Sequence, residues 1–184
     1  CLLYNVPYRL VGGVNFYQRK EIKDILAYLR TIANGRDDVS VMRIINVPKR
    51  GIGAASVSKA EIFASANGYS MYDAFARVRA IPSMGKAADK IQKFVDLIEE
   101  FREKISGGEY GIPELIEDVL ERTGYKADLE SEGEVEAETR LENIEELVNK
   151  AAAYEEDSEA PSLDEFLEQV ALVADIDSMD DTEE

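Results

Sequence analysis

The chain has 184 residues and is strongly acidic, with 21 Lys or Arg against 38 Asp or Glu and a formal net charge of −17 at pH 7. This length suits one ordinary domain, and 45% hydrophobic residues are enough for a buried core. The single Cys1 excludes an internal disulfide, and the lack of His argues against an ordinary zinc cluster.

The ends and the apolar runs bear on where the protein works. No apolar run is long enough to span a bilayer, and no signal-peptide pattern opens the chain. We therefore expect a cytoplasmic protein with no membrane partner. The chain begins at Cys1 rather than Met, inside an apolar stretch, so we expect it to be a segment of a longer protein.

The first residues read differently from the rest. Tyr8–Val11 is a short strand-like run, and Gly12 and Gly13 stop it. One strand cannot form a sheet, so we assign this strand to a neighbouring α/β domain. We place residues 1–18 at the end of that domain and expect residues before about Arg19 to lie apart from the helical core.

From about Arg19 onward, apolar residues recur at helical spacing. The pattern predicts an all-α domain over residues 19–174 with about eight helices. Residues 155–161 read as a linker by composition, and residues 175–184 as an acidic, poorly ordered connection. The predicted helices lie near residues 22–32, 41–45, 57–66, 71–78, 88–105, 115–120, 135–151 and 163–172.

The most informative stretch is Ile44–Gly53, between the second and third predicted helices. Pro48 prevents the earlier helix from continuing, and two glycines on either side of Ile52 suit a tight turn. Ile52 can fill the gap between the two helices. The pattern predicts a helix, a hairpin and a second helix, similar to a helix-hairpin-helix motif.

This hairpin presents groups that suit an anion. The first N–H groups of the second helix have no intrahelical acceptor, and Lys49, Arg50 and Lys59 lie close to them in sequence. A nucleic-acid phosphate is the natural ligand. The alternative is that the glycines only turn a corner and the cations are solvated, and the hairpin alone does not decide between the two.

The uneven distribution of charge supports the phosphate. Residues 1–60 contain ten Lys or Arg and four Asp or Glu, whereas the remaining residues contain 11 and 34. A molecule with one basic and one acidic end can approach a phosphate backbone with its basic side. The simpler alternative is that the acidic residues only cover the solvated faces of helices.

Two further groups of polar residues lie on predicted helices. Arg19 and Glu21 could bind a ligand or lock the glycine turn before them, and the structural role is favoured. Arg140, Asn143 and Glu146 fall on neighbouring turns, so they could join elements by hydrogen bonds. Surface ion pairing is the simpler interpretation of that second group.

The residues do not assemble a catalytic site. No Gly-rich loop ends in Gly-Lys-Ser or Gly-Lys-Thr, so a phosphate cradle for a nucleoside triphosphate is missing. Without His, neither a His-assisted nucleophile nor a Cys/His pair can form. Most carboxylates fall at helical spacings that face solvent, so we expect this chain alone to be inert.

Three stretches resemble superfamily 1 DNA helicases of the UvrD, PcrA and Rep type, with PcrA-like helicases the most similar group. Val11–Arg30 resembles the segment that joins domains 2A and 2B of these helicases. Ile44–Gly53 is similar to the Gly-Ile-Gly hairpin of their 2B domain, and Arg140–Val148 to a later stretch before the chain returns to 2A. The resemblance covers nearly the whole chain in the right order.

The resemblance implies that residues 1–18 end domain 2A, residues 19–174 form the 2B domain, and residues 175–184 lead back to 2A. The parent protein would be an ATP-dependent 3′–5′ DNA helicase of DNA repair and replication. Its ATP and Mg²⁺ would bind outside this chain, which itself would hold no cofactor or metal. The partners implied are the phosphate backbone of duplex DNA, without sequence preference, and the rest of the helicase.

The resemblance also implies roles for particular residues. Gly12, Gly13 and Arg19 match the junction between 2A and 2B. Duplex contact is carried over to Lys49, Arg50, Gly51, Ile52, Gly53, Ser56 and Lys59.

Two rival classes use similar features. A base-excision glycosylase or a nuclease can carry a similar hairpin, but a glycosylase would be expected to place a catalytic Asp shortly after it, and Gly68 to Asp73 offers no such setting. A non-enzymatic, acidic helical module that binds a protein is the stronger alternative. DNA binding measured with and without Lys49 and Arg50 separates it from the helicase.

Overall fold

A computed structural model describes residues 15–180 of the chain. Those residues form helices and connections with no strand among them, which confirms the predicted all-α class. The predicted strand Tyr8–Val11 and the glycines Gly12 and Gly13 lie outside the described residues.

Nine α-helices and two short 3₁₀ helices follow one another between residues 15 and 180. Their bounds are η1 Phe16–Gln18, α2 Lys20–Ala33, α3 Asp38–Ile44, α4 Ala54–Asn67, α5 Met71–Ala76, η2 Val78–Ala80, α6 Ala87–Ser106, α7 Ile112–Arg122, α8 Tyr125–Glu130, α9 Glu134–Asp157 and α10 Leu163–Asp180.

Helix α2 is the centre of the molecule. Ten of its 14 residues are buried, and it contacts α3, α6, α7, α9 and α10. Tyr28, Leu29 and Ile32 of α2 are fully buried beside Phe94 and Phe101 of α6 within one apolar core. Because α2 is buried on nearly every side, it connects the helices at one end of the molecule to those at the other.

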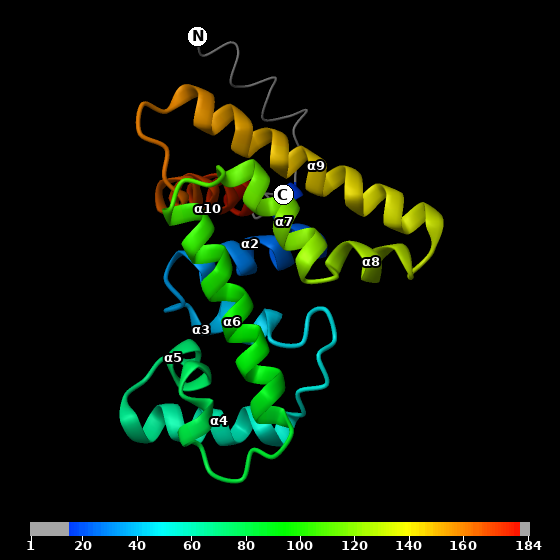
Figure 1. The fold of residues 1–184 in the computed structure, drawn as a ribbon. Helices are drawn as coiled ribbons and strands as arrows, with labels where there is room; N and C mark the ends of the chain where they lie inside the picture. The colour runs from blue at the N-terminus through cyan, green and yellow to red at the C-terminus, as the bar shows by residue number, and fades with distance from the viewer. Residues whose placement is uncertain (1–14, 181–184) are drawn as a thin grey trace.

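The other helices form two ends around α2. One end holds α3, α4, α5 and the first turns of α6, while α7, α8, α9 and α10 form the other (Figure 1). Residues 107–180 contain 24 Asp or Glu and four Lys or Arg. The charge asymmetry of the sequence therefore becomes an asymmetry in space, because the acidic residues gather on the α7–α10 end.

Several helix ends have residues that favour them. The Ser70 side chain accepts a hydrogen bond from the Asp73 N–H at 3.1 Å and caps α5. Gly68 ends α4 with φ of 68°, in the left-handed region that favours glycine. Pro113 stands in the first turn of α7, where its missing N–H costs nothing.

The structure differs from the sequence prediction in three places. Helix α8 was not predicted, because six residues are too few to show a helical period, although Tyr125 and Leu129 are buried on it. Helix α9 continues to Asp157, into the predicted linker, and Tyr154 in its last turns is buried and accepts the Ser162 N–H at 3.1 Å. Helix α10 continues past Ala174 to Asp180.

The expectation that residues before Arg19 lie apart from the core is wrong for Phe16. Its ring is 1% exposed and belongs to the main core cluster. The ring lies edge-on to Tyr17, and the Arg19 guanidinium stands 5.5 Å from its centroid. Burial of a whole aromatic ring is strongly favourable, so η1 packs with the helices that follow it.

Candidate nucleic-acid interface

The loop between α3 and α4, residues 45–53, projects on the side of the molecule away from α5 (Figure 1). Asp37 caps the start of helix α3, and its carboxylate accepts both the N–H and the hydroxyl of Ser40. It buries Val41 and Ile44 against the core and ends at Ile44. The loop is therefore anchored at its start by packed apolar side chains.

Arg50 turns inward from this loop. One guanidinium nitrogen donates to the carbonyl oxygens of Ile44 and Ile45, at 2.6 and 3.1 Å, and the other donates to the Tyr28 hydroxyl at 2.5 Å. The guanidinium carbon also stands 4.9 Å from the centroid of the Phe94 ring. Arg50 thus neutralises the carbonyl end of α3 and lies against α2 and α6.

Asn46 holds the far side of the same loop. Its side-chain oxygen accepts the N–H of Ile52 at 3.0 Å, and its side-chain nitrogen donates to the Ile52 carbonyl at 2.6 Å. Ile52 itself is 4% exposed, as its position between the two glycines predicts. Sequence reasoning missed Asn46, because an Asn in a turn has many local partners and only the fold brings Ile52 opposite to it.

The two glycines of the loop differ in their backbone. Gly51 has φ of +74°, where an L side chain is strained. Gly53 has φ of −72° and ψ of 158°, and a Cβ added there meets nothing within 4 Å. The loop therefore favours glycine at residue 51, whereas at residue 53 the missing side chain leaves the backbone open to solvent.

Helix α4 starts directly after Gly53 with its first turn open. No side chain caps this end, and within residues 15–180 the N–H groups of Ala54, Ala55 and Ser56 have no acceptor. Gly53, Ala54 and Ala55 are exposed, and Ser56 is partly exposed. Three donors and the positive end of the helix dipole thus face the space beside the loop.

The lysines near the loop have different partners. Lys49 is exposed, and no side chain or carbonyl oxygen of the described part pairs with it. Lys59 donates to the Ser83 carbonyl at 2.6 Å and so ties α4 to the loop before α6. Of the predicted cations, Lys49 is therefore the one whose charge is open to a ligand, while Arg50 and Lys59 are hydrogen-bonded to the protein.

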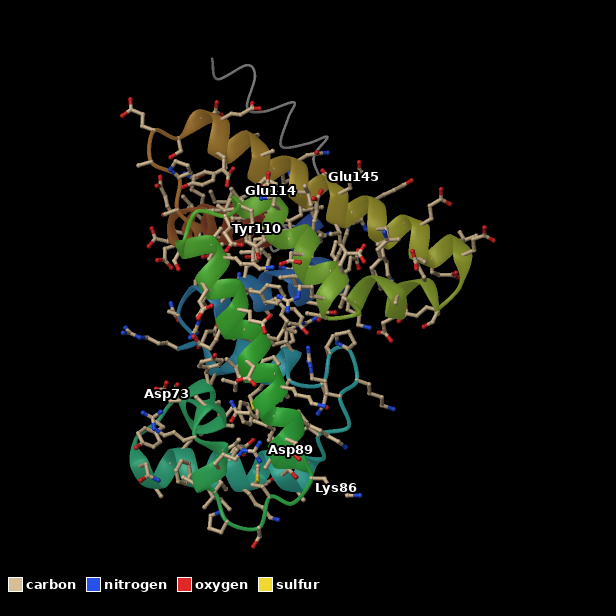
Figure 2. All side chains as sticks on the ribbon, in the orientation of Figure 1. Asp73, Lys86, Asp89, Tyr110, Glu114 and Glu145 are labelled. Carbon is tan, nitrogen blue, oxygen red and sulfur yellow. The ribbon has the colours of Figure 1, made fainter. Side chains whose placement is uncertain are left out.

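Helix α6 adds cations that sequence reasoning missed. Lys90 donates to the Gly51 carbonyl at 3.2 Å, although the two residues lie 39 positions apart. Lys86, Lys90 and Lys93 repeat at helical spacing and are exposed, so they share one face of the start of α6. Figure 2 shows Lys86 at this end of α6. Their spacing was readable in the sequence, but their place beside the hairpin was not.

A second polar cluster joins α2 to α9. The side-chain oxygen of Asn143 accepts from Arg19 at 2.7 Å, and its nitrogen donates to the Glu21 carboxylate at 2.7 Å. Arg140 instead pairs with Glu132. Asn143 does join two elements, whereas the glycine turn that Arg19 and Glu21 were predicted to lock lies outside the described residues.

Two acidic residues of α2 depart from the sequence analysis. Glu21 and Asp24 are 5% and 2% exposed, although carboxylates at helical spacing were expected to face solvent. Asp24 accepts from Arg43 at 2.8 Å and from the Tyr125 hydroxyl at 2.7 Å. Burial, followed by this bond to Asp24, raises the pKa of Tyr125. Each buried carboxylate is thus matched by donors from other helices.

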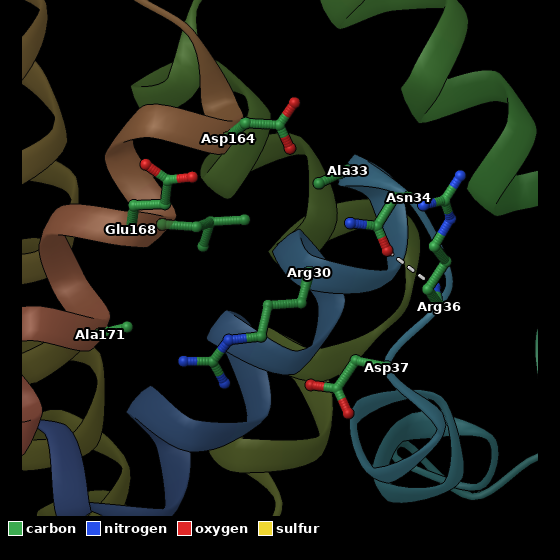
Figure 3. Close-up of a pocket in the computed structure, with 9 residues that line it drawn as sticks. Arg30, Ala33, Asn34, Arg36, Asp37, Asp164, Glu168 and Ala171 are labelled. Atoms are coloured by element: carbon green, nitrogen blue, oxygen red, sulfur yellow. Dashed lines mark hydrogen bonds between the residues drawn. The ribbon is translucent and has the colours of Figure 1, made fainter.

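A hollow between α2 and α10 does not single out another ligand. It measures about 590 Å³, and Arg30 and Arg36 share its walls with Asp37, Asp164 and Glu168 (Figure 3). Such mixed charge favours neither an anion nor a cation. Within residues 15–180, no group of three His, Cys, Asp or Glu side chains could hold a metal ion, and no helix is both long and apolar enough to cross a bilayer.

The comparisons with known proteins identify the family of this chain. Residues 3–184 match the UvrD-like helicase C-terminal domain, so the chain belongs to this family. Three curated proteins to which it is similar are the ATP-dependent DNA helicases PcrA of Staphylococcus epidermidis, Bacillus subtilis strain 168 and Staphylococcus aureus. Each is 45% identical over 178 residues, which are 96% of this chain and 24% of the relative. The family resemblance drawn from the sequence is confirmed, and the chain spans about a quarter of the length of these relatives.

Proposed function

We propose that this chain is the 2B domain, with the adjoining end of domain 2A, of an ATP-dependent 3′–5′ DNA helicase of DNA repair and replication. Membership of the UvrD-like family and similarity to proteins named ATP-dependent DNA helicase support the proposal. In it, residues 1–18 end domain 2A, residues 19–174 form 2B and residues 175–184 return to 2A. The motor, with its ATP and Mg²⁺, lies in other parts of the parent protein, which works in the cytoplasm.

The role of this domain is to hold duplex DNA by its phosphates. The observation that carries this role is the open first turn of α4, where three N–H donors have no acceptor in the described part and Gly53 leaves their approach clear. Lys49 adds an unpaired positive charge at the same corner. Together these groups match one phosphate group in charge and in hydrogen-bond donors.

The acidic end sets the direction of approach. Because α7–α10 carry most of the Asp and Glu, a phosphate backbone is repelled there and admitted at the hairpin and the start of α6. Backbone amides and lysines do not read base edges, so binding is independent of DNA sequence. The domain thus binds the duplex without recognising its base sequence.

The rest of the parent protein carries out ATP hydrolysis and DNA unwinding. The chain has no Gly-Lys-Ser or Gly-Lys-Thr loop, so we expect the 184-residue protein alone neither to hydrolyse ATP nor to unwind DNA. Phosphate release measured with and without DNA checks this expectation. DNA-stimulated release by the purified chain would show that the assignment of roles is wrong.

A salt titration of duplex binding tests the contact. The 184-residue chain should bind duplex DNA weakly, with a dissociation constant in the micromolar range or above. A plot of log affinity against log salt concentration should have a slope of roughly −2 to −3. The Lys49→Gln variant should reduce the magnitude of the slope by about one. Gly53→Val should weaken binding by covering the approach to the α4 amides, and a Cβ at this position meets no protein atom within 4 Å.

The matched control is Arg36→Gln. Arg36 is exposed and precedes α3, whereas Lys49 follows it, so the same charge is lost at the other end of that helix. Its affinity and slope should stay close to those of the unmodified chain. If Lys49→Gln, Gly53→Val and Arg36→Gln all bind like the unmodified chain, the loop only connects two helices and does not contact DNA. The acidic protein-interaction module then becomes the better explanation.

A further inference from the structure

Arg50 lies in the proposed DNA-contacting loop, yet the structure gives its guanidinium a different set of neighbours. It donates to the Ile44 and Ile45 carbonyls of the α3 end and to the Tyr28 hydroxyl of α2. It also stacks over Phe94 of α6. A guanidinium engaged with three helices cannot reach a phosphate in solvent without breaking those hydrogen bonds.

Tyr28 completes this arrangement on the protein side. It is fully buried, and its hydroxyl donates to the Val47 carbonyl at 2.5 Å while it accepts from Arg50. Both directions of the hydroxyl are therefore used by the loop. Burial raises the pKa of Tyr28, and the Arg50 charge opposes that rise, so the hydroxyl stays protonated at neutral pH and able to donate.

Resting on the proposed function, we propose that Arg50 is a positioning residue rather than a phosphate contact. Together with Tyr28 it holds residues 45–53 against α2, α3 and α6. The held loop presents Lys49 outward and keeps Gly53 and the first turn of α4 open. Within the corner predicted from sequence, Lys49 and the α4 amides would then touch DNA, and Arg50 would act through them.

The two roles predict different effects on binding. A phosphate contact contributes to the salt slope, because each neutralised phosphate releases counterions. A positioning residue changes the geometry of the other contacts, so its loss lowers affinity at each salt concentration with the slope unchanged. Arg50→Lys keeps the charge but cannot reproduce the planar, multiply bonded guanidinium. Tyr28→Phe changes no charge and removes only a buried hydroxyl.

The experiment combines two measurements on the 184-residue chain and its variants. Hydrogen exchange without DNA is followed at the Val47 and Ile52 amides, which are bonded inside the loop, with the Leu147 amide of α9 as a reference. Duplex affinity is measured over a salt series. For Tyr28→Phe and Arg50→Lys we expect faster exchange at Val47 and Ile52 only, and affinity lowered about fivefold with an unchanged slope.

Lys49→Gln serves as the contrasting variant and should lower the slope without changing exchange. The inference is overturned if Tyr28→Phe and Arg50→Lys leave exchange at Val47 and Ile52 unchanged. It is also overturned if Arg50→Lys binds like the unmodified chain while Arg50→Gln lowers the slope by about one. If exchange rises in Arg50→Lys but Lys49→Gln leaves affinity and slope unchanged, Arg50 still holds the loop and it is the DNA contact that fails.

Discussion

Tyr125 and Asp24 form a hydrogen bond of 2.7 Å between positions 101 residues apart, and both side chains are buried. Tyr125 is the first residue of α8, the helix that periodicity did not reveal, and Asp24 lies in the second turn of α2. Arg43 of α3 completes the site from the other side at 2.8 Å. The Asp24 carboxylate thus joins three helices, α2, α3 and α8, and so links the acidic end to the helix that precedes the α3–α4 loop.

Removing the Tyr125 hydroxyl should destabilise the fold. Tyr125→Phe leaves the buried Asp24 carboxylate with one donor fewer, which should lower the free energy of unfolding by about 1–3 kcal/mol. Urea denaturation at pH 7 measures this change. Tyr110→Phe is the matched control, because its hydroxyl bonds to Asp118 in a more exposed place and should cost less. Equal losses in both variants would contradict the special role of the Asp24 site.

The same tyrosine should make stability depend on alkaline pH. The pKa of Tyr125 is raised above its ordinary value of 10.0, first by burial and then by the bond to Asp24. The folded state therefore keeps a proton that the unfolded state loses above pH 10. The stability from Tyr125 is complete below that pH and falls as pH rises above it, by at most about 1.4 kcal/mol per pH unit.

Denaturation curves between pH 9 and 11 check this dependence. Tyr125→Phe should lose less stability over this range than the unmodified chain. A Tyr125→Phe curve parallel to that of the unmodified chain would show that this tyrosine is not the source.

The two loop glycines should respond differently to the same substitution. Gly51→Ala places a side chain at φ of +74° and should lower the free energy of unfolding by about 1–2 kcal/mol. Gly53→Ala adds a methyl group to extended backbone in open space and should leave stability nearly unchanged. Thermal unfolding of the pair measures the contrast. A larger loss for Gly53→Ala than for Gly51→Ala would contradict the loop geometry.

Asn143 should matter through its two side-chain bonds. Asn143→Ala leaves the nearly buried Glu21 without its amide donor and Arg19 without its acceptor, so the free energy of unfolding should fall by about 1–3 kcal/mol. Asn149→Ala on the exposed side of α9 is the control and should be close to neutral. The urea midpoints of the two variants measure the difference. Equal midpoints would show that the bonds of Asn143 to Arg19 and Glu21 do not stabilise the fold.

Local patterns explain why much of the fold was predictable. The apolar period of residues 22–32 and 88–105, with turn residues such as Asn67–Gly68 and Pro113, marks helices whose cores and ends depend on neighbouring residues. The end of the helix before Pro48 and the start of the next helix after Gly53 were predictable for the same reason, since Pro48 and the glycines act on their own backbone. Helix α8 was missed because its two buried residues form too short a pattern.

The sequence by itself determined that the chain is helical, that Ile52 would be buried, and that cations would lie close in sequence to the start of the following helix. Only the tertiary structure decided which of those cations face outward. The Arg50 guanidinium turns toward the protein rather than toward solvent because it contacts Tyr28 and Phe94, and Phe94 lies 44 residues further along the chain. In the same way, Asp24 is buried because donors from α3 and α8 arrive beside it. Periodicity reports which side of a helix is apolar, but the energy of a buried charge depends on partners that only folding brings within reach.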